Sequence, residues 1–301
     1  MKGGVGKSAI SCNLGVGLAR EGMRVCIIDT DPQGNATFSL GIEDRDSLED
    51  TMSSFIDREI NGNQIPVRNY IIHNNEEVDI IPCNIELATY DYAMMTAYNR
   101  EHMLEKMVKE LKKDYDYILI DCSPSLNLMT INVLTCADSV IIPVEPATLS
   151  IEGLQLLIES IRSMKKKLNR KLKIEGIVIN NVELRQKEDQ RNIEELQEVY
   201  GDKIRIFDAM IPKSVRMREC TAHGVSIFTY DPNGKAAQGF EDLSKEVLAY
   251  AILVVAPEKD RRVTIKQEKI MKFFSSDMSD KEIEDTIYKV LEEWYLSRKG
   301  A

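Results

Sequence analysis

The chain has 301 residues and a formal net charge of −10, and 43% of its residues are hydrophobic. This length allows one or two domains, and the acidic balance argues against a protein that binds nucleic acid over its whole surface. No apolar run approaches the roughly 20 residues that a membrane-spanning helix needs, and no secretory signal is visible. The six cysteines lack metal-ligand spacing, so we expect reduced thiols in a cytoplasmic protein.

The first predicted element is a phosphate-binding loop, Lys2-Gly3-Gly4-Val5-Gly6-Lys7-Ser8, followed by a helix from Ala9. Its glycines let backbone N–H groups point at one phosphate chain. Lys7 would contact the β- and γ-phosphates, and the Ser8 hydroxyl would ligate Mg²⁺. The usual loop pattern requires a glycine where Met1 stands, whereas a variant with Lys2 inside the loop fits fully. The loop predicts a nucleoside triphosphate with Mg²⁺, although only Met1 precedes it where a buried strand normally leads in.

Apolar runs alternate with helical stretches along the rest of the chain. We predict strands at 24–29, 78–81, 116–121, 139–144, 174–180 and 204–207. This alternation is typical of an α/β fold with a doubly wound, mostly parallel sheet and helices on both faces. Asp29 and Asp31 stand at the end of the first run, and Asp121 ends the third. Such strand ends bind ligands in these sheets, and Asp121 can hold Mg²⁺ directly or through water.

Basic residues are concentrated in two places despite the acidic total. The stretch from 162 to 173 holds seven basic and no acidic residues, and Lys213, Arg216 and Arg218 form a second group, with Arg185 between the two in sequence. No recognition helix or aromatic platform is apparent, so the pattern predicts sequence-independent binding to the DNA backbone. The alternative for Lys165, Lys166 and Lys167 is a solvated helix end that complements the helix dipole.

The C-terminal part reads as a separate segment, and we predict an ATPase domain over 1–256 and a linker with a helical tail over 257–301. Pro257 breaks the preceding helix, and Ser279 opens a capping box before one apolar helical face. That face would pack on the first domain, a second tail or a partner. The tail helix carries more acidic than basic residues, which opposes its use as a membrane anchor.

These motifs together resemble the ParA/MinD group of deviant-Walker P-loop ATPases, and most of all the ParA/Soj partition ATPases. Matching segments include the loop, the box from Asp29 to Thr37, the region from Tyr115 to Leu126, and the run from Ile211 to Arg216. The resemblance covers roughly residues 1–255. Two departures are Ser123 and Asn127, where the family often has proline and glycine. Family members also carry a central strand ahead of the loop, and this chain extends past their usual end.

The resemblance implies a role for each matching position. Lys2 would reach the phosphates of a partner subunit, and Asp31 would polarise the attacking water; we take these two as catalytic. Mg²⁺ would be held by Ser8 and Asp121. The remaining positions are implied to bind ATP or DNA. For ATP these are Gly3, Gly4, Val5, Gly6, Lys7, Ser8, Ala9, Asn180 and Pro212, and for DNA Arg185, Lys213 and Arg216.

The implied activity is that of a slow, cytoplasmic and nucleoid-associated ATPase that segregates plasmid, chromosome or mobile-element DNA. ATP would bridge a homodimer, the dimer would bind DNA non-specifically, and a ParB-like partner would stimulate hydrolysis. One alternative is a membrane-positioning ATPase of the MinD kind. The other is a non-enzymatic DNA-binding or interaction protein with a degenerate nucleotide site.

Overall fold

The computed structural model describes residues 5–148 and 151–255. Contacts between Cα atoms group Met1–Val254 into one compact unit. Lys2, Gly3 and Gly4 lie outside the described residues, as do the predicted linker, short strand and capped helix of the tail. The proposed division of the chain near residue 256 therefore stays a prediction.

Within the described residues, seven strands form two sheets. The first sheet has the order β2-β3-β1-β4 and the second β5-β6-β7. Every pairing is parallel except that of β2 with β3. The strands are β1 (Val25–Asp29), β2 (Ile72–His73), β3 (Asp79–Ile81), β4 (Tyr117–Asp121), β5 (Ser139–Val144), β6 (Lys173–Val182) and β7 (Ile206–Pro212).

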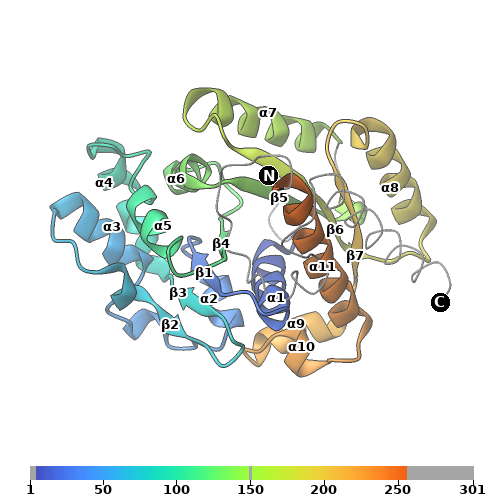
Figure 1. Cartoon of the computed structure of the whole chain (residues 1–301), viewed down its shortest axis with the longest axis horizontal. Coiled ribbons are helices and arrows are strands. Elements are labelled where there is room, and N and C mark those ends of the chain that lie inside the picture. Colours follow the sequence, from blue (N-terminus) through green and yellow to red (C-terminus); the bar gives the residue numbers. More distant parts are fainter. Residues whose placement is uncertain (1–4, 149–150, 256–301) are drawn as a thin grey trace, which may run out of the picture. The chain divides into compact units, whose positions relative to one another are not determined.

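Helices connect the strands and cover the sheets (Figure 1). The α-helices are α1 (Lys7–Arg20), α2 (Asn35–Ser39), α3 (Met52–Asn61), α4 (Asp91–Thr96), α5 (Glu105–Leu111), α6 (Leu128–Cys136), α7 (Ile151–Lys167), α8 (Lys187–Tyr200), α9 (Val215–Ala222), α10 (Ile227–Tyr230) and α11 (Lys235–Val255). The 3₁₀ helices are η1 (Arg45–Ser47), η2 (Val67–Tyr70), η3 (Ile85–Tyr90) and η4 (Pro146–Thr148).

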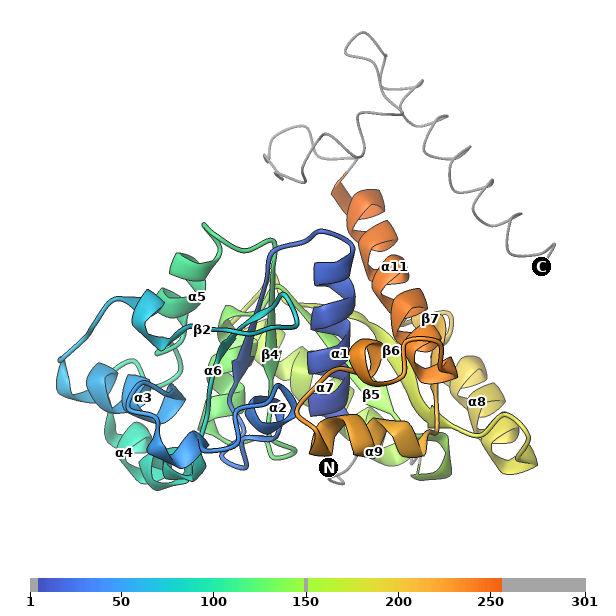
Figure 2. The same cartoon turned by 90° about the horizontal axis from the view of Figure 1, so that it is seen from below.

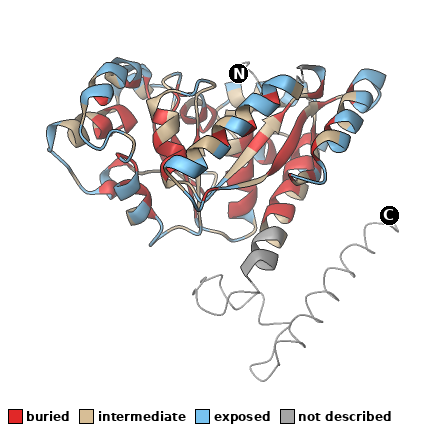
Figure 3. Cartoon of the chain, turned by 90° about the horizontal axis from the view of Figure 1, so that it is seen from above, coloured by how far each residue is buried: buried red, intermediate tan, exposed pale blue. Residues whose placement is uncertain are grey.

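Three clusters of apolar side chains place these helices on both faces. Helices α1 and α11 pack against strands of both sheets through one cluster, and they lie side by side in both views (Figures 1 and 2). On the other face α3, α5 and α6 cover the first sheet, and α6, α7 and α8 cover the second. The buried strands stand out in red in Figure 3. The predicted fold class, a mostly parallel α/β sheet covered on both faces, is confirmed.

The β-sheet is interrupted within the described residues, and the resemblance implies that family members carry a further, central strand ahead of the loop. Among the described residues no strand joins β4 to β5, so each has one edge without a strand partner. The side chains of β1 are all buried, whereas four of the five in β4 are only partly buried. Residues of β5 are likewise exposed or partly buried at Ser139, Val140 and Ile141. The two sheets are joined through helix side chains rather than through a β-ladder.

The predicted strands agree with the structure in position and differ at some ends. The strand at 139–144 has the predicted bounds, and those ending at 29, 81 and 121 each begin one residue later than predicted. The strand predicted at 204–207 runs instead from Ile206 to Pro212. The exposed Asp208 interrupts the apolar pattern, so nothing in the sequence indicates that the strand continues beyond it. The two-residue strand β2 was not predicted.

Candidate functional site

The described end of the phosphate loop forms an anion-ready helix terminus. Gly6 precedes α1 with φ of 82°, in the left-handed region that favours glycine. No side chain caps the first turn of α1, and that turn contains no acidic residue. Its N–H groups are therefore available to an anion, which the helix dipole also favours. Lys7, Ser8 and Ala9 are the first three residues of α1 and are partly buried.

Asn180 ties this loop to the second sheet. Its side-chain amide donates a hydrogen bond to the carbonyl oxygen of Val5, with an N–O distance of 2.9 Å. A Cβ atom placed on Gly6 would lie only 2.2 Å from the same amide nitrogen. Pro212 ends β7 and is paired in register with Val182, so it lies at the same edge of the sheet as Asn180. The sequence placed both residues near the nucleotide, and the structure brings Asn180 into contact with the loop.

Asp121 offers a buried carboxylate oxygen beside the start of α1. The residue is 1% exposed, and its Oδ1 accepts a hydrogen bond of 3.2 Å from the Ser11 hydroxyl. Its Oδ2 is buried without a hydrogen-bond partner among the described residues. Burial raises the pKa of Asp121 to about 6, while Ser8, Ser11 and Lys7 act in the opposite direction. A buried carboxylate oxygen without a hydrogen-bond donor, close to the Ser8 hydroxyl, suits Mg²⁺, so these residues fit the expected metal.

The loop after β1 holds Asp31 in a defined turn. Asp31 is 7% exposed, and its Oδ1 accepts the Gln33 N–H at 3.0 Å. The Asp31 N–H in turn donates to Asp29 Oδ1 at 3.1 Å. Asp29 Oδ2 accepts both the N–H and the hydroxyl of Thr37, at 2.9 and 2.8 Å. Asp29 thus shapes the loop that presents Asp31.

Two residues at this site, Ser11 and Thr30, were not assigned a role from the sequence, and Asp29 was predicted only to stand at a ligand-binding strand end. Ser11 follows Ser8 by three positions and therefore lies on the same helical face. This spacing could have indicated from the sequence that Ser11 belongs to the site. The Thr30 hydroxyl donates to the Asp121 carbonyl oxygen at 2.6 Å and links the two aspartate strands. Asp29 and Asp121 are register partners on β1 and β4. Burial, followed by the nearby Asp121 charge, raises the pKa of Asp29 to about 7.

The three cations predicted to bind DNA follow the carboxyl ends of β6 and β7 but differ in their contacts. Arg185 is exposed in the turn between β6 and α8. The Lys213 ammonium forms an ion pair with Glu183, and its backbone N–H donates to the Val182 carbonyl at 3.0 Å. Arg216, in the first turn of α9, forms an ion pair of 2.8 Å with Glu219. A polyanion would have to displace these two carboxylates before it could pair with Lys213 and Arg216.

In the described ranges 5–148 and 151–255, no helix is both long and apolar enough to cross a bilayer. No group of three or more His, Cys, Asp or Glu residues is placed to hold a metal ion there. All six cysteines are free, and four of them are buried, as expected.

Sequence comparison gives closely matching relatives. A family profile described as an AAA domain matches residues 1–174. The sporulation initiation inhibitor protein Soj of Bacillus subtilis is 40% identical over 248 residues, which cover 82% of this chain and 95% of that protein. The chromosome-partitioning ATPase Soj of Treponema pallidum is 34% identical over 82% of this chain and 94% of its own length.

Structural comparison agrees with these relatives. A crystal structure titled cobyrinic acid a,c-diamide synthase from Mycobacterium smegmatis, with a bound ATP analog and magnesium, superposes with a TM-score of 0.71. It is 26% identical in sequence, and the match covers 83% of this chain and 92% of that one. The motifs, the fold and these relatives together show that the chain belongs to the ParA/Soj-type family of partition ATPases.

Proposed function

We propose that the chain is an ATP-dependent DNA-partition ATPase that dimerises on ATP, binds DNA without sequence preference and hydrolyses ATP when a ParB-like partner stimulates it. The observation that carries this proposal is the gathering of Ser8, Asp31, Asp121 and Asn180 at the carboxyl ends of β1, β4 and β6, around the start of α1. Phosphoryl transfer depends on positioning and charge neutralisation rather than on a covalent intermediate, and this edge supplies both.

Each side chain has a distinct task in this proposal. The first-turn amides of α1 and the Lys7 ammonium hold the phosphates. Ser8 and Asp121 hold Mg²⁺, which when bound neutralises phosphate charge. Asn180 fixes the carbonyl of Val5 and contacts the base, with Pro212 beside it. Asp31 orients the attacking water, and Asp29 holds the turn that presents it.

The proposed assembly is a dimer that ATP joins at the nucleotide site. Lys2 would contribute to the phosphate site of a second subunit, so ATP would join two copies. The dimer would then present two sets of Arg185, Lys213 and Arg216 to DNA, and contacts to phosphate strengthen steeply with the number of cations. A ParB-like partner would trigger hydrolysis and thereby release the DNA.

The test separates binding from hydrolysis by replacing Asp31 with alanine in the full chain. We expect D31A to retain ATP-dependent binding to a duplex of arbitrary sequence and to lose phosphate release. Lys7→Ala serves as the comparison, because it should lose ATP binding and both later steps. Loss of DNA binding together with intact hydrolysis in D31A would contradict the assigned roles.

The same preparations decide between the other two functional classes. Pelleting with anionic liposomes in the presence of ATP would indicate a membrane-positioning ATPase of the MinD kind. Absence of ATP turnover in the presence of both DNA and a ParB-like partner would indicate a non-enzymatic binding protein. We expect neither result.

A further inference from the structure

Two carboxylates stand among the cations that follow the carboxyl ends of β6 and β7. Glu183, the first residue after β6, forms an ion pair with the ammonium of Lys213, the first residue after β7. Glu219 on α9 forms an ion pair of 2.8 Å with Arg216. The four side chains are between 36% and 57% exposed, so a polyanion in solvent can reach both pairs.

The fold places Glu183 and Lys213 next to each other. Val182 and Pro212 are register partners on β6 and β7, and the two charged residues take the next position along each strand. The Lys213 N–H donates to the Val182 carbonyl oxygen at 3.0 Å, which continues the contact between the two segments. The second carboxylate oxygen of Glu183 accepts a hydrogen bond of 2.7 Å from the Gln186 side-chain amide. The carboxylate is therefore held in place by more than the ammonium alone.

A second donor also holds the carboxylate of Glu219. This residue follows Arg216 by three positions on α9, so the two lie on one helical face. Its Oε2 accepts hydrogen bonds from the Arg216 guanidinium at 2.8 Å and from the Tyr230 hydroxyl at 3.2 Å. Tyr230 ends α10, and its ring stacks on that of His223 with 5.4 Å between the centroids. The ion pair on α9 is thus tied to the neighbouring helix.

Both carboxylates are charged at neutral pH. A hydrogen bond from Lys213 lowers the pKa of Glu183. One from Arg216 lowers the pKa of Glu219. Each carboxylate therefore offsets the positive charge of its partner under the conditions in which the protein would bind DNA.

The ion pairs make the three predicted DNA contacts unequal. Arg185 is exposed and forms no ion pair with any described residue, so its charge is available to phosphate. Exposed pairs such as those of Lys213 and Arg216 add little to folding stability. They matter more for a polyanion, because affinity for DNA rises with the number of phosphates that the protein neutralises. A cation that already has a carboxylate partner gains less from a phosphate.

We propose that Glu183 and Glu219 compete with DNA phosphate for these cations and thereby limit how tightly the ATP-bound protein holds DNA. The inference rests on the proposed function, since the polyanion is DNA and its binding still requires ATP. Arg185 makes the unopposed contact, whereas Lys213 and Arg216 contribute only after they exchange a carboxylate for a phosphate. This exchange keeps the affinity below the value that three free cations would give, so DNA is released more readily after hydrolysis.

The test uses the full chain with Mg²⁺, a non-hydrolysable ATP analogue and a duplex of arbitrary sequence, and it measures fluorescence anisotropy over a range of salt. We expect E183Q/E219Q to bind about fivefold to tenfold more tightly than the parent. The slope of log affinity against log salt should steepen by about 1 to 2, because each phosphate contact adds roughly 0.9. An unchanged affinity and slope would overturn the proposal.

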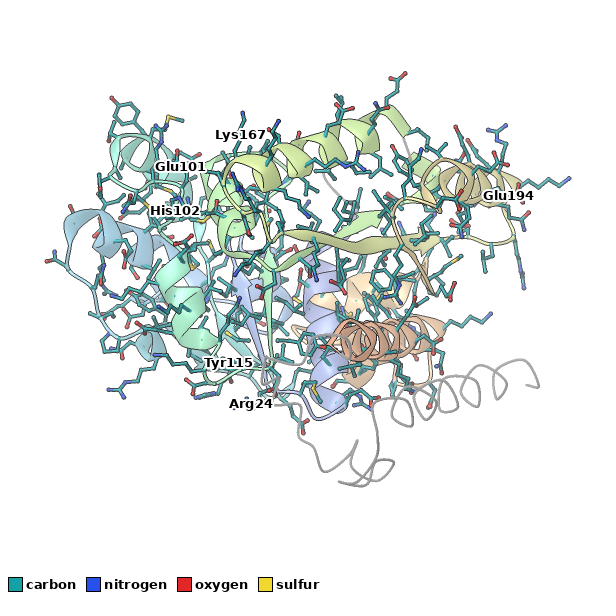
Figure 4. The ribbon with its side chains drawn as sticks, turned by 45° about the horizontal axis from the view of Figure 1, so that its top comes forward. Arg24, Glu101, His102, Tyr115, Lys167 and Glu194 are labelled. Carbon is teal, nitrogen blue, oxygen red and sulfur yellow. The ribbon has the colours of Figure 1, made fainter. Side chains whose placement is uncertain are left out.

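The matched control is E194Q/E198Q, which removes two negative charges from exposed positions on α8; Glu194 is labelled in Figure 4. We expect this control to stay close to the parent. An equal gain in both double variants would overturn the proposal, because the effect would then come from net charge alone.

A double-mutant cycle tests whether Glu183 acts through Lys213. The gain in affinity from E183Q should be much smaller when Lys213→Gln is also present, because the cation to be freed is then missing. The same gain in both backgrounds would contradict the proposed competition. Failure of the proposed function would appear differently, as a parent protein that does not bind the duplex even with the ATP analogue.

Discussion

Gly6 combines a left-handed backbone with a crowded environment. Its φ of 82° strains any residue that carries a Cβ, and the Asn180 amide occupies the space where that atom would lie. The two costs have different sources, because one belongs to the backbone and the other to a single neighbouring side chain. They can therefore be separated by mutation.

We expect Gly6→Ala to cost about 1–2 kcal/mol of backbone strain and, in addition, to displace Asn180 and weaken ATP binding strongly. Gly62→Ala is the matched control, since Gly62 has φ of 74° but no heavy atom within 4 Å of its Cβ position. The double variant G6A/N180A should be less destabilised than the sum of its single variants. Urea unfolding of the parent, G6A, N180A, G6A/N180A and the control G62A checks this, and strict additivity would show that the contact carries no energy.

Asp29 makes stability depend on pH at the residue scale. Its folded-state pKa of about 7 lies above the ordinary value of 3.8, because the carboxyl is buried beside Asp121. Between about pH 4 and 7 the folded state therefore holds a proton that the unfolded state releases. The contribution of Asp29 to stability is complete below that window and is lost as pH rises through it.

In the absence of Mg²⁺ and nucleotide, we expect the free energy of unfolding to fall between pH 5 and 7 more steeply for the parent than for Asp29→Asn. The amide substitution removes the titration, although it weakens the hydrogen bonds to Asp31 and Thr37 at every pH. The difference in slope is the readout, measured by chemical unfolding at several pH values. Parallel curves would assign the pH dependence to other groups.

At the scale of elements, Glu246 joins α11 to the outer strand of the second sheet. Its carboxylate accepts hydrogen bonds from the Arg205 guanidinium at 2.8 Å and from the N–H groups of Asp208 and Ala209 at 3.1 and 3.0 Å. The residue is only 8% exposed. Removing it would leave a half-buried cation and two backbone donors without this acceptor.

We expect Glu246→Ala to lower the free energy of unfolding by about 3 kcal/mol. Glu241→Ala, which breaks the partly exposed pair between Glu241 and Lys245 on the same helix, should cost less than about 1 kcal/mol. Both values come from urea unfolding. Similar losses in the two variants would mean that the backbone contacts of Glu246 contribute little.

Sequence patterns predicted strands well where a continuous run of apolar residues marks the strand. Continuous apolar runs located β1, β4 and β5, and the aspartates that end β1 and β4 indicated the edge of the sheet where the candidate site lies. The end of β7 was missed because Asp208 interrupts the pattern, and its backbone partner Glu246 is distant in sequence. For the same reason the sequence could not show that Lys213 forms an ion pair with Glu183, or Arg216 with Glu219. Such pairings depend on tertiary placement, which no local pattern records.

At the scale of the whole molecule, we expect the division into two sheets to determine which strands unfold together during local opening. Backbone hydrogen bonds connect β2-β3-β1-β4 and, separately, β5-β6-β7. Between the two sets the connection includes side chains from α1, α6, α10 and α11. Groups of residues that share a hydrogen-bonded ladder tend to open together, so the two sheets are expected to form separate opening units.

Hydrogen exchange in the nucleotide-free protein checks this expectation. Ile142→Ala, which truncates a side chain in β5 that is 2% exposed, should raise amide exchange throughout β5, β6 and β7. Exchange in β1 and β3 should change much less. Ile28→Ala in β1 should give the converse pattern. Equal acceleration in both sheets for either variant would show that they open as one unit.

The nucleotide site lies across that division. Asp121 ends β4 of the first sheet and Asp31 lies in the loop after β1, while Asn180, which donates a hydrogen bond to the Val5 carbonyl, belongs to β6 of the second sheet. A molecule bound at this edge would contact residues of both sheets, which share no β-ladder within the described residues. Because a ligand that binds only the folded form stabilises it, ATP bound at this edge would strengthen the connection between the two sheets, and its loss would weaken that connection again.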